Sequence, residues 1–238
     1  MKILVDAHTH TIASDHAYST IQENAAAAAR AGLEALGMTD HAPPLSDAPN
    51  VMHFQNMRVL DREICGVTVL RGAELNICDA EGSLFLPDEA LQGLDFCIAS
   101  MHSIVYASRD PAENLRAYRG AMENARVRII GHPEDARVPV DFAALARAAR
   151  DSMTLLEVNN SSLRSITYRQ NPLENMAAML RACEACGAYV CLGSDAHFSS
   201  AVGRFDESLA LLAQTGFPEE LVANTSLEKF LRLIARKG

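Results

Sequence analysis

The stretch Ile3-Leu4-Val5-Asp6-Ala7-His8-Thr9-His10 runs from an apolar segment directly into two histidines. An apolar run of this length predicts a buried strand, which we place at 3–7. Because side chains alternate along an extended backbone, His8 and His10 are expected to point to the same side beyond the end of that strand. Asp195-Ala196-His197 repeats this spacing near the other end of the chain. The two segments together predict a fold that gathers distant strand ends at one site.

Strands and helices are predicted to alternate along the rest of the chain. Six further apolar runs predict strands at 34–39, 67–75, 94–100, 127–131, 154–158 and 188–193. The other segments predict helices at about 20–31, 111–125, 139–150, 172–186 and 204–214, and across much of 218–236 beyond a short Val222-Ala223-Asn224 segment. Alternation of this kind indicates a parallel sheet, either open or closed, that is covered by helices.

The residues at the strand ends distinguish a closed sheet from an open one. No GxGxxG or Walker A motif follows any of these strands, so the nucleotide-binding open sheets lose support. Histidines and carboxylates follow the strands instead, at the carboxyl ends where barrel enzymes build their active sites. An open sheet would spread these residues along a line. We therefore predict an α/β fold, a distorted (β/α)7 barrel that forms a single domain over residues 1–238.

The composition limits the partners and the compartment. A net charge of −9 disfavours a surface for long nucleic acid, which would need a basic stripe. No apolar run is long enough to span a membrane, and the chain begins with the first predicted strand in place of a signal peptide. We therefore expect a cytoplasmic protein whose six cysteines are reduced. Cys183-x-x-Cys186 lies within a predicted helix and has no second CxxC pair, so we interpret it as structural.

Nine residues near the predicted strand ends have side chains that commonly bind zinc, manganese or iron. They are His8, His10, His16, His41, Glu74, His102, His132, Asp195 and His197. A single histidine at such a position is more often a structural hydrogen-bonding group, but that does not explain the repeated HxH, DH and DxH placements. One tetrahedral zinc needs only three or four ligands, so this set indicates more than one metal ion. Asp6 and Asp40 could orient neighbouring histidines or cap turns.

Taken together, these motifs resemble those of the PHP (polymerase and histidinol phosphatase) metallophosphoesterases. The matching segments are Asp6-Ala7-His8-Thr9-His10, Thr39-Asp40-His41, Gly72-Ala73-Glu74, His102, Gly131-His132-Pro133 and Gly193-Ser194-Asp195-Ala196-His197. The chain looks most like the small YcdX-type phosphatases, through His16-Ala17-Tyr18-Ser19-Thr20, Asn56-Met57-Arg58 and Glu157-Val158-Asn159-Asn160-Ser161-Ser162. The resemblance covers nearly the whole chain, and it implies a distorted seven-stranded barrel with a trinuclear metal site.

The resemblance also implies that the nine residues divide among three metal ions. The implied groups are a first of His8, His10, Glu74 and Asp195, a second in which Glu74 is shared with His102 and His132, and a third of His16, His41 and His197. We expect three divalent metal ions, with zinc first and manganese or iron as alternatives that the same nitrogen and oxygen ligands accept.

A site with several divalent ions and only two carboxylates is strongly positive and favours a phosphate group. We therefore predict a phosphatase that hydrolyses small phosphomonoesters by in-line attack of a metal-activated hydroxide on phosphorus. A small phosphorylated metabolite is the expected partner, and the sequence makes no prediction of oligomeric state. His53 could protonate the leaving oxygen and Arg58 could clamp the phosphate. Each is equally consistent with a surface residue that has no such role.

Other functions of the same residues stay open at this point. A nucleotide-directed phosphoesterase, either a nucleoside-bisphosphate phosphatase or an exonuclease, and a histidinol phosphatase would use the same site. A metal-dependent amidohydrolase is less favoured, because such barrels commonly bridge metals with a modified lysine and all three lysines here lie near the termini. A non-catalytic binding module of the PHP type is less favoured because none of the nine expected ligands is missing.

Overall fold

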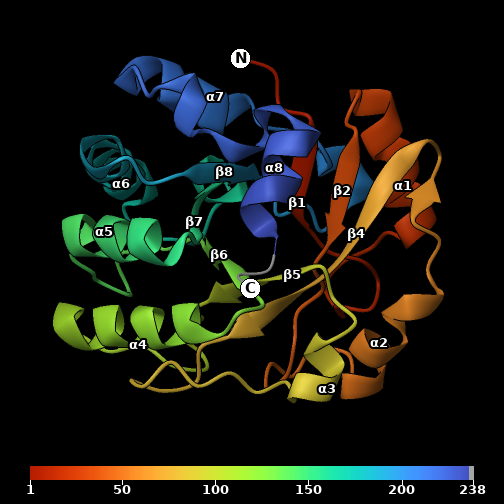
Figure 1. Cartoon of the computed structure of the whole chain (residues 1–238), viewed down its shortest axis with the longest axis horizontal. Helices are drawn as coiled ribbons and strands as arrows, with labels where there is room; N and C mark the ends of the chain where they lie inside the picture. The colour runs from red at the N-terminus through yellow and green to blue at the C-terminus, as the bar shows by residue number, and fades with distance from the viewer. Residues whose placement is uncertain (236–238) are drawn as a thin grey trace.

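Seven parallel strands form a nearly closed barrel in the computed structural model, which describes residues 1–235 (Figure 1). Each strand pairs with the next in the order β1 (Val5–Thr9), β2 (Ala35–Met38), β4 (Val67–Asn76), β5 (Phe96–Ser100), β6 (Val127–Gly131), β7 (Leu155–Asn159) and β8 (Val190–Gly193). A two-residue strand, β3 (Glu63–Ile64), pairs antiparallel with the start of β4. The predicted α/β fold with a distorted seven-stranded barrel is confirmed.

The barrel closes between β1 and β8 at the carboxyl ends of these strands. Thr9 forms an isolated parallel bridge with Ala196. The backbone N–H of Asp195 donates to the carbonyl of His8 at 2.9 Å, and the N–H of His10 donates to the carbonyl of Ala196 at the same distance. The first and last strands of the barrel therefore meet at His8-Thr9-His10 and Asp195-Ala196-His197, the two histidine-containing motifs.

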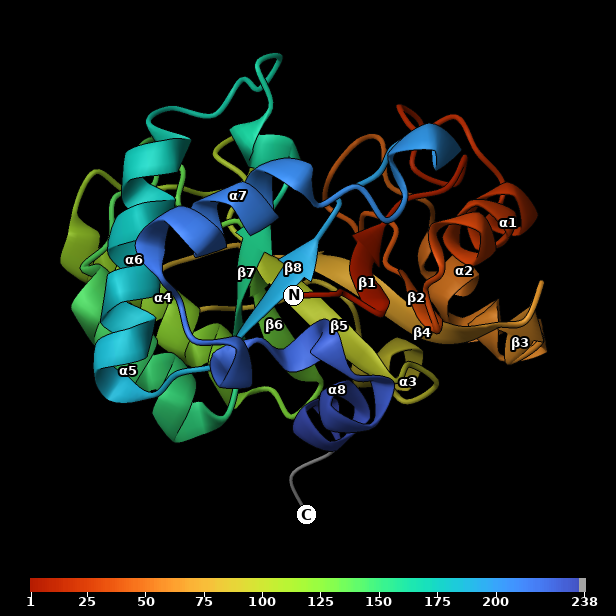
Figure 2. The same ribbon diagram turned by 90° about the horizontal axis from the view of Figure 1, so that it is seen from above.

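Residues after β8 close the opposite, amino-terminal end of the barrel. The side-chain amide of Asn224 donates to the carbonyls of Val5 and Leu192, each at 2.8 Å, and so connects β1 to β8. The helix α8 (Leu227–Ile234) follows, and its Phe230 packs edge-on against Phe96 inside the barrel at 6.0 Å between ring centroids. Figure 2 shows α8 at one end of the barrel and the long loops after β1, β7 and β8 at the other.

Within residues 1–235, five helices of ten or more residues surround the sheet (Figure 1). They are α1 (Ile21–Ala31), α4 (Pro111–Glu123), α5 (Phe142–Ser152), α6 (Pro172–Cys186) and α7 (Asp206–Thr215). A capping box begins α1, where the Thr20 hydroxyl accepts from the N–H of Glu23 and the Glu23 carboxylate accepts from the N–H of Thr20. Gly32 ends this helix in the left-handed conformation, with φ 73°. No helix within residues 1–235 is long and apolar enough to cross a lipid bilayer.

The structure differs from the predicted pattern mainly in short elements. The sequence indicates loops where the structure has α2 (Val51–Asn56), the 3-10 helix η1 (Met57–Val59) and α3 (Asp88–Leu91). Segments this short cannot show helical periodicity. Further 3-10 turns are η2 (Ser161–Leu163), η3 (Ser199–Ala201), η4 (Glu219–Leu221) and η5 (Ala223–Thr225). The last two precede α8, which lies where the sequence predicts a helix beyond Val222-Ala223-Asn224; residue 236 of that prediction lies outside the described range.

Candidate metal centre

Glu74 lies at the centre of a group of histidines at the carboxyl end of the barrel. Strand β4 carries it into the interior, where its side chain is 1% exposed. Its Oε2 atom lies 2.9 Å from Nδ1 of His41, 3.5 Å from Nε2 of His8 and 3.7 Å from Nε2 of His10. These three histidines come from β1 and from the segments directly after β1 and β2. One carboxylate oxygen therefore faces the histidines of the first two strands.

The other carboxylate oxygen of Glu74 faces the histidines that follow β5 and β6. Its Oε1 atom lies 2.9 Å from Nε2 of His132 and 3.5 Å from Nε2 of His102. The hydroxyl of Ser100 also donates to Oε1, at 2.6 Å. The two oxygens thus divide the surrounding imidazoles into two sets, which is the arrangement expected of a carboxylate shared between two cations.

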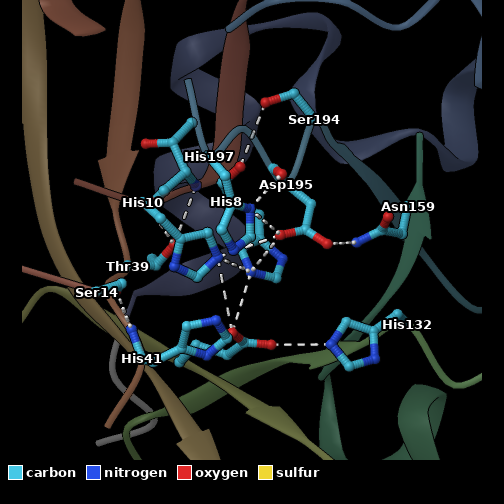
Figure 3. Close-up of polar contacts among 12 residues, drawn as sticks. His8, His10, Ser14, Thr39, His41, His132, Asn159, Ser194, Asp195 and His197 are labelled. Carbon is cyan, nitrogen blue, oxygen red and sulfur yellow. Dashed lines mark hydrogen bonds and ion pairs between the residues drawn. The ribbon is translucent and has the colours of Figure 1, made fainter. Parts of the chain in front are cut away.

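Asp195, two residues after the end of β8, supplies a second carboxylate to the first set. Its Oδ1 lies 3.2 Å from Nε2 of His10 and 3.7 Å from Nε2 of His8. Its Oδ2 accepts a hydrogen bond from the Asn159 side chain at 3.2 Å. The backbone of Asp195 has φ 52°, a conformation uncommon outside glycine. Figure 3 shows His8, His10 and Asp195 directed at a common centre, with His197 beside them.

A third group of donors lies next to the first. The ring of His16 is 4.4 Å from that of His197 and 5.1 Å from that of His41, between centroids. His16 is half exposed, and its Nδ1 lies 2.6 Å from Oδ2 of Asp47. Ligand atoms of His16, His41 and Asp47 lie within 4.8 Å of one another, as do those of His10, His41 and His197. The structure therefore brings all nine predicted ligands to one place and adds Asp47.

Hydrogen bonds behind the rings orient several of these histidines. Nδ1 of His8 lies 2.7 Å from Oε1 of Glu157, and Nδ1 of His102 lies 2.7 Å from the amide oxygen of Asn76. Nδ1 of His197 donates to the backbone carbonyl two residues earlier, at 3.0 Å. A ring that donates from Nδ1 keeps the lone pair of Nε2 free. The three rings therefore present Nε2 as a possible ligand atom.

The carboxylate of Glu157 connects His8 of β1 to His132, the residue directly after β6. Glu157 is a buried charged residue within the apolar strand β7, and besides His8 it accepts from the backbone N–H of His132 at 2.8 Å and from Asn159 at 3.2 Å. Gly193 leaves the space that this carboxylate occupies, since a Cβ there would lie 2.1 Å from Oε1 of Glu157. This role was not predicted from the sequence, although a single charged residue within an apolar run is a signal that could have indicated it.

The charges of the cluster set its protonation. Burial raises the pKa of Glu74, but the neighbouring histidines, with His8 foremost, reverse this and hold it well below its usual range. The pKa of Asp195 is also well below its usual range, because the histidines outweigh the effect of burial. Burial and the adjacent His41 lower the pKa of His10 to about 3. Charged carboxylates and the neutral imidazole of His10 are forms that bind cations. Burial lowers the pKa of His8 and of His41, but the neighbouring carboxylates outweigh it and raise both, so a cation would have to displace a proton from these two rings.

Two buried nitrogen atoms show that the cluster fits metal ions. Within residues 1–235, Nε2 of His41 and Nε2 of His197 are shielded from water and make no hydrogen bond. Buried polar atoms without partners are costly, and a cation between these rings would satisfy them. Imidazole nitrogens with carboxylate oxygens are a donor set that zinc, manganese and iron accept.

Arg169 belongs to the site although the sequence did not predict it. It lies in the loop between η2 and α6, and its side chain is 6% exposed. One terminal guanidinium nitrogen lies 2.8 Å from Nδ1 of His132, and the other lies 3.6 Å from Oδ2 of Asp195. No local pattern distinguishes Arg169 from the exposed Arg164 of the same loop. Its position depends on the path of the loop.

His53 and Arg58 lie outside the cavity that contains the metal ligands. That cavity has a volume of about 810 Å³ and is lined by several of the histidines together with Arg169. His53, in α2, has Nε2 at 3.3 Å from Oδ2 of Asp40 and lines a separate cavity of about 460 Å³. Arg58 is exposed on η1. Neither position supports the substrate contacts expected from the sequence.

Comparisons with known proteins find relatives over nearly the whole chain. A probable phosphatase of Acetivibrio thermocellus is 42% identical over 237 residues, which cover 100% of this chain and 97% of that protein. A probable phosphatase of Citrobacter koseri is 40% identical over 234 residues, covering 98% and 95%.

A solved structure extends the likeness in fold. The histidinol phosphate phosphatase of Lactococcus lactis, crystallised with zinc, L-histidinol and phosphate, superposes over 100% of both chains with a TM-score of 0.64 at 16% identity. The family model of the PHP domain matches residues 6–163. These residues include seven of the nine predicted ligands, from His8 to His132. With this match and full-length relatives near 40% identity, the chain belongs to the PHP domain family.

Proposed function

We propose that this protein is a phosphatase that hydrolyses small phosphomonoesters at a site for three divalent metal ions. The main support is the position of Glu74, whose two oxygens face separate sets of histidines. The third group of donors, around His16, lies beside the first set. Relatives that are 42% and 40% identical over nearly the whole chain are named probable phosphatases, which supports phosphoester chemistry.

The proposed ligands follow the three groups of donors. The first ion would take His8, His10, Glu74 and Asp195, the second Glu74, His102 and His132, and the third His16, His41 and His197. Zinc is the metal we expect first, since the Lactococcus lactis protein of similar fold was crystallised with zinc. Manganese and iron suit the same donors.

Bound divalent ions would supply positive charge for the phosphate oxygens and would lower the pKa of a bound water. The chain's own residues hold the geometry around them. Arg169 reaches the cavity between His132 and Asp195, where its guanidinium would bind a phosphate oxygen through charged hydrogen bonds. Asn159 holds Oδ2 of Asp195 and so keeps Oδ1 directed at the histidines. We therefore assign the phosphate contact first expected of Arg58 to Arg169.

The size and charge of the molecule favour a small substrate. The cavity of about 810 Å³ suits a metabolite-sized ligand. The net charge of −9 disfavours long nucleic acid as a substrate. All six cysteines are free, which suits the reducing cytoplasm that we propose as the location.

The proposal is tested by metal analysis together with phosphate release from a panel of phosphomonoesters. The panel includes L-histidinol phosphate and a nucleoside 3′,5′-bisphosphate, and a matched set of amides tests for amidohydrolase activity. We expect close to three metal ions per chain and hydrolysis of phosphomonoesters only. In oxygen-18 water a single turnover should place the label in inorganic phosphate, because water attacks phosphorus and the alcohol leaves with its own oxygen.

A matched pair of variants separates the site from the rest of the molecule. Asp195→Asn should lose metal and activity, whereas Glu174→Gln, at the exposed start of α6, should retain both. Fewer than two metal ions per chain, together with no phosphate release after reconstitution, would overturn the proposal. Label found in the alcohol would overturn the attack on phosphorus.

A further inference from the structure

Large apolar side chains gather around the mouth of the cavity that contains the metal ligands. Thirteen such side chains are exposed within residues 1–235, and five of them line this one cavity. They are Tyr18, Ile104, Ile166, Tyr168 and Phe198, with exposures from 53% to 83%. Exposed apolar residues are ordinary when they are scattered, but a group around a site usually marks a binding surface.

The five residues, which we call the apolar rim, lie on the loops that carry proposed metal ligands or Arg169. Tyr18 and Ile104 each lie two residues after a proposed ligand, and Phe198 directly follows His197. Tyr168 directly precedes Arg169. The N–H of Tyr18 donates to the carbonyl of His197 at 2.8 Å, which places the loops after β1 and β8 side by side. Four of the rim residues therefore stand one or two residues from a group that would hold the phosphate, and Ile166 stands three residues before Arg169.

The rim also surrounds the site on several sides. The loops that carry it follow β1, β5, β7 and β8, and β5 lies three strands away from both β1 and β8 around the barrel. Ile104 on the β5 side therefore lies across the mouth from Tyr18 and Phe198. A group attached to a phosphate at the metal centre would have to pass between these side chains to reach solvent.

The charged groups at the mouth mostly have polar partners already. Arg204 pairs with Asp206 at 3.0 Å, and Glu207 accepts from Asn160 at 2.8 Å. Arg164 is the exposed cation of the mouth with no ion pair in the described residues. The apolar surface is thus more available to a ligand than the ionic groups are, apart from this one arginine.

We propose that the apolar rim binds the leaving group, so that the preferred substrate is the phosphomonoester of an alcohol that carries an apolar, ring-sized group. The proposal rests on the phosphatase function proposed above, because the phosphate must sit at the metal centre for the rim to meet the leaving group. Hydrolysis by water then releases this alcohol and inorganic phosphate, with the phosphorus–oxygen ester bond broken. Burial of the ring between the rim side chains provides the selectivity.

The test compares primary alkyl phosphates whose leaving alcohols differ in one end group. 3-Phenylpropyl phosphate, propyl phosphate, 3-aminopropyl phosphate and propane-1,3-diyl bisphosphate are assayed with the metal-loaded protein. We expect kcat/KM for the phenyl compound to exceed that for propyl phosphate by about tenfold to a hundredfold. A preference for the bisphosphate would show that Arg164 binds the leaving group. A preference for the amine would show that the carboxylates at the mouth of the cavity bind it. Either result would overturn the proposal.

Variants locate the selectivity on the rim. Phe198→Ser and Ile104→Ser should each lower the ratio of phenyl to propyl activity severalfold, at unchanged metal content. Phe85→Ser is the matched control, because Phe85 has a similar exposure of 55% but does not line the cavity. Equal losses on both substrates would overturn the rim's role. A change in oligomeric state by light scattering without a change in the ratio would identify the rim as an interface and would overturn it as well.

The failure of the two proposals can be told apart. If the phosphatase function itself is wrong, the metal-loaded protein will release no phosphate from any of the four compounds or from p-nitrophenyl phosphate. If only the leaving-group proposal is wrong, all esters will be hydrolysed with no preference for the phenyl compound.

Discussion

Replacement of Glu157 by glutamine would remove one negative charge beneath two of the proposed metal ligands without changing the size of the side chain. The carboxylate is 1% exposed and accepts three hydrogen bonds. These come from Nδ1 of His8 at 2.7 Å, the backbone N–H of His132 at 2.8 Å and the side chain of Asn159 at 3.2 Å. All three partners are donors toward Glu157, so the site requires two accepting oxygens.

A carboxamide has only one such oxygen, and each of its two orientations loses a contact. If its NH₂ group faces His8, the imidazole must move its proton to Nε2, which removes the lone pair expected to bind metal. If it faces the N–H of His132, two donors meet and a charged hydrogen bond of about 1.5–3 kcal/mol is lost. Changes to such supporting residues typically cost about tenfold to a hundredfold in metal affinity. We expect Glu157→Gln to fall in that range.

Competition with a chromophoric chelator measures the metal affinity, and kcat/KM on a phosphomonoester measures the activity. Both should fall together, and excess metal should restore part of the activity. Glu174→Gln is the control, because it makes the same chemical change at the exposed start of α6. The reasoning is refuted if Glu157→Gln folds with wild-type metal affinity and wild-type kcat/KM.

Four further predictions concern other parts of the molecule. Removal of metal with a chelator should lower the melting temperature by several degrees and abolish activity, and zinc, manganese or iron should restore both. Gly120→Ala should lower the free energy of unfolding by about 1–3 kcal/mol in urea, because its Cβ would lie 1.8 Å from a carbonyl oxygen of the adjacent loop, with metal content unchanged. Alkylation of the native protein should modify the exposed Cys65 first and Cys183 only after unfolding, because burial raises the pKa of the Cys183 thiol to about 12. His53→Ala should retain kcat/KM within about twofold, whereas Arg169→Lys should lower it about tenfold or more, as measured on poor and good leaving groups alike.

The fold could be predicted from the sequence because its strands are buried on both faces. Each strand is then a continuous apolar run, and all seven lie within two residues of their predicted limits. The candidate ligands could be predicted for a related reason. In a parallel barrel the carboxyl ends of all strands meet on one rim. A histidine at a strand end, such as His8 or His132, must therefore lie on that rim.

Loop residues could not be predicted in this way. Arg169 reaches His132 from a loop 37 residues later, and nothing in the sequence records that path. Asp47 approaches His16 for the same reason. His53 could not be placed either, since its partner Asp40 is reached only because the short helix α2 folds back over the loop after β2.

Asp6 and Asp40 show how the closed barrel and the metal centre depend on each other. The carboxylate of Asp6 accepts from the backbone N–H groups of Ser194 and Gly203, so it holds the segment after β8 against β1. Asp40 accepts from the backbone N–H and hydroxyl of Thr11, and so holds the loop after β1. The two carboxylates therefore fix the backbone that carries the ligands, and they act less on the imidazole rings.

The barrel has only a few backbone contacts between β1 and β8, and these lie at residues 8–10 and 195–196, among the proposed metal ligands. A cation held by His8, His10 and Asp195 would link the first strand to the last, so metal binding would contribute directly to closure of the barrel.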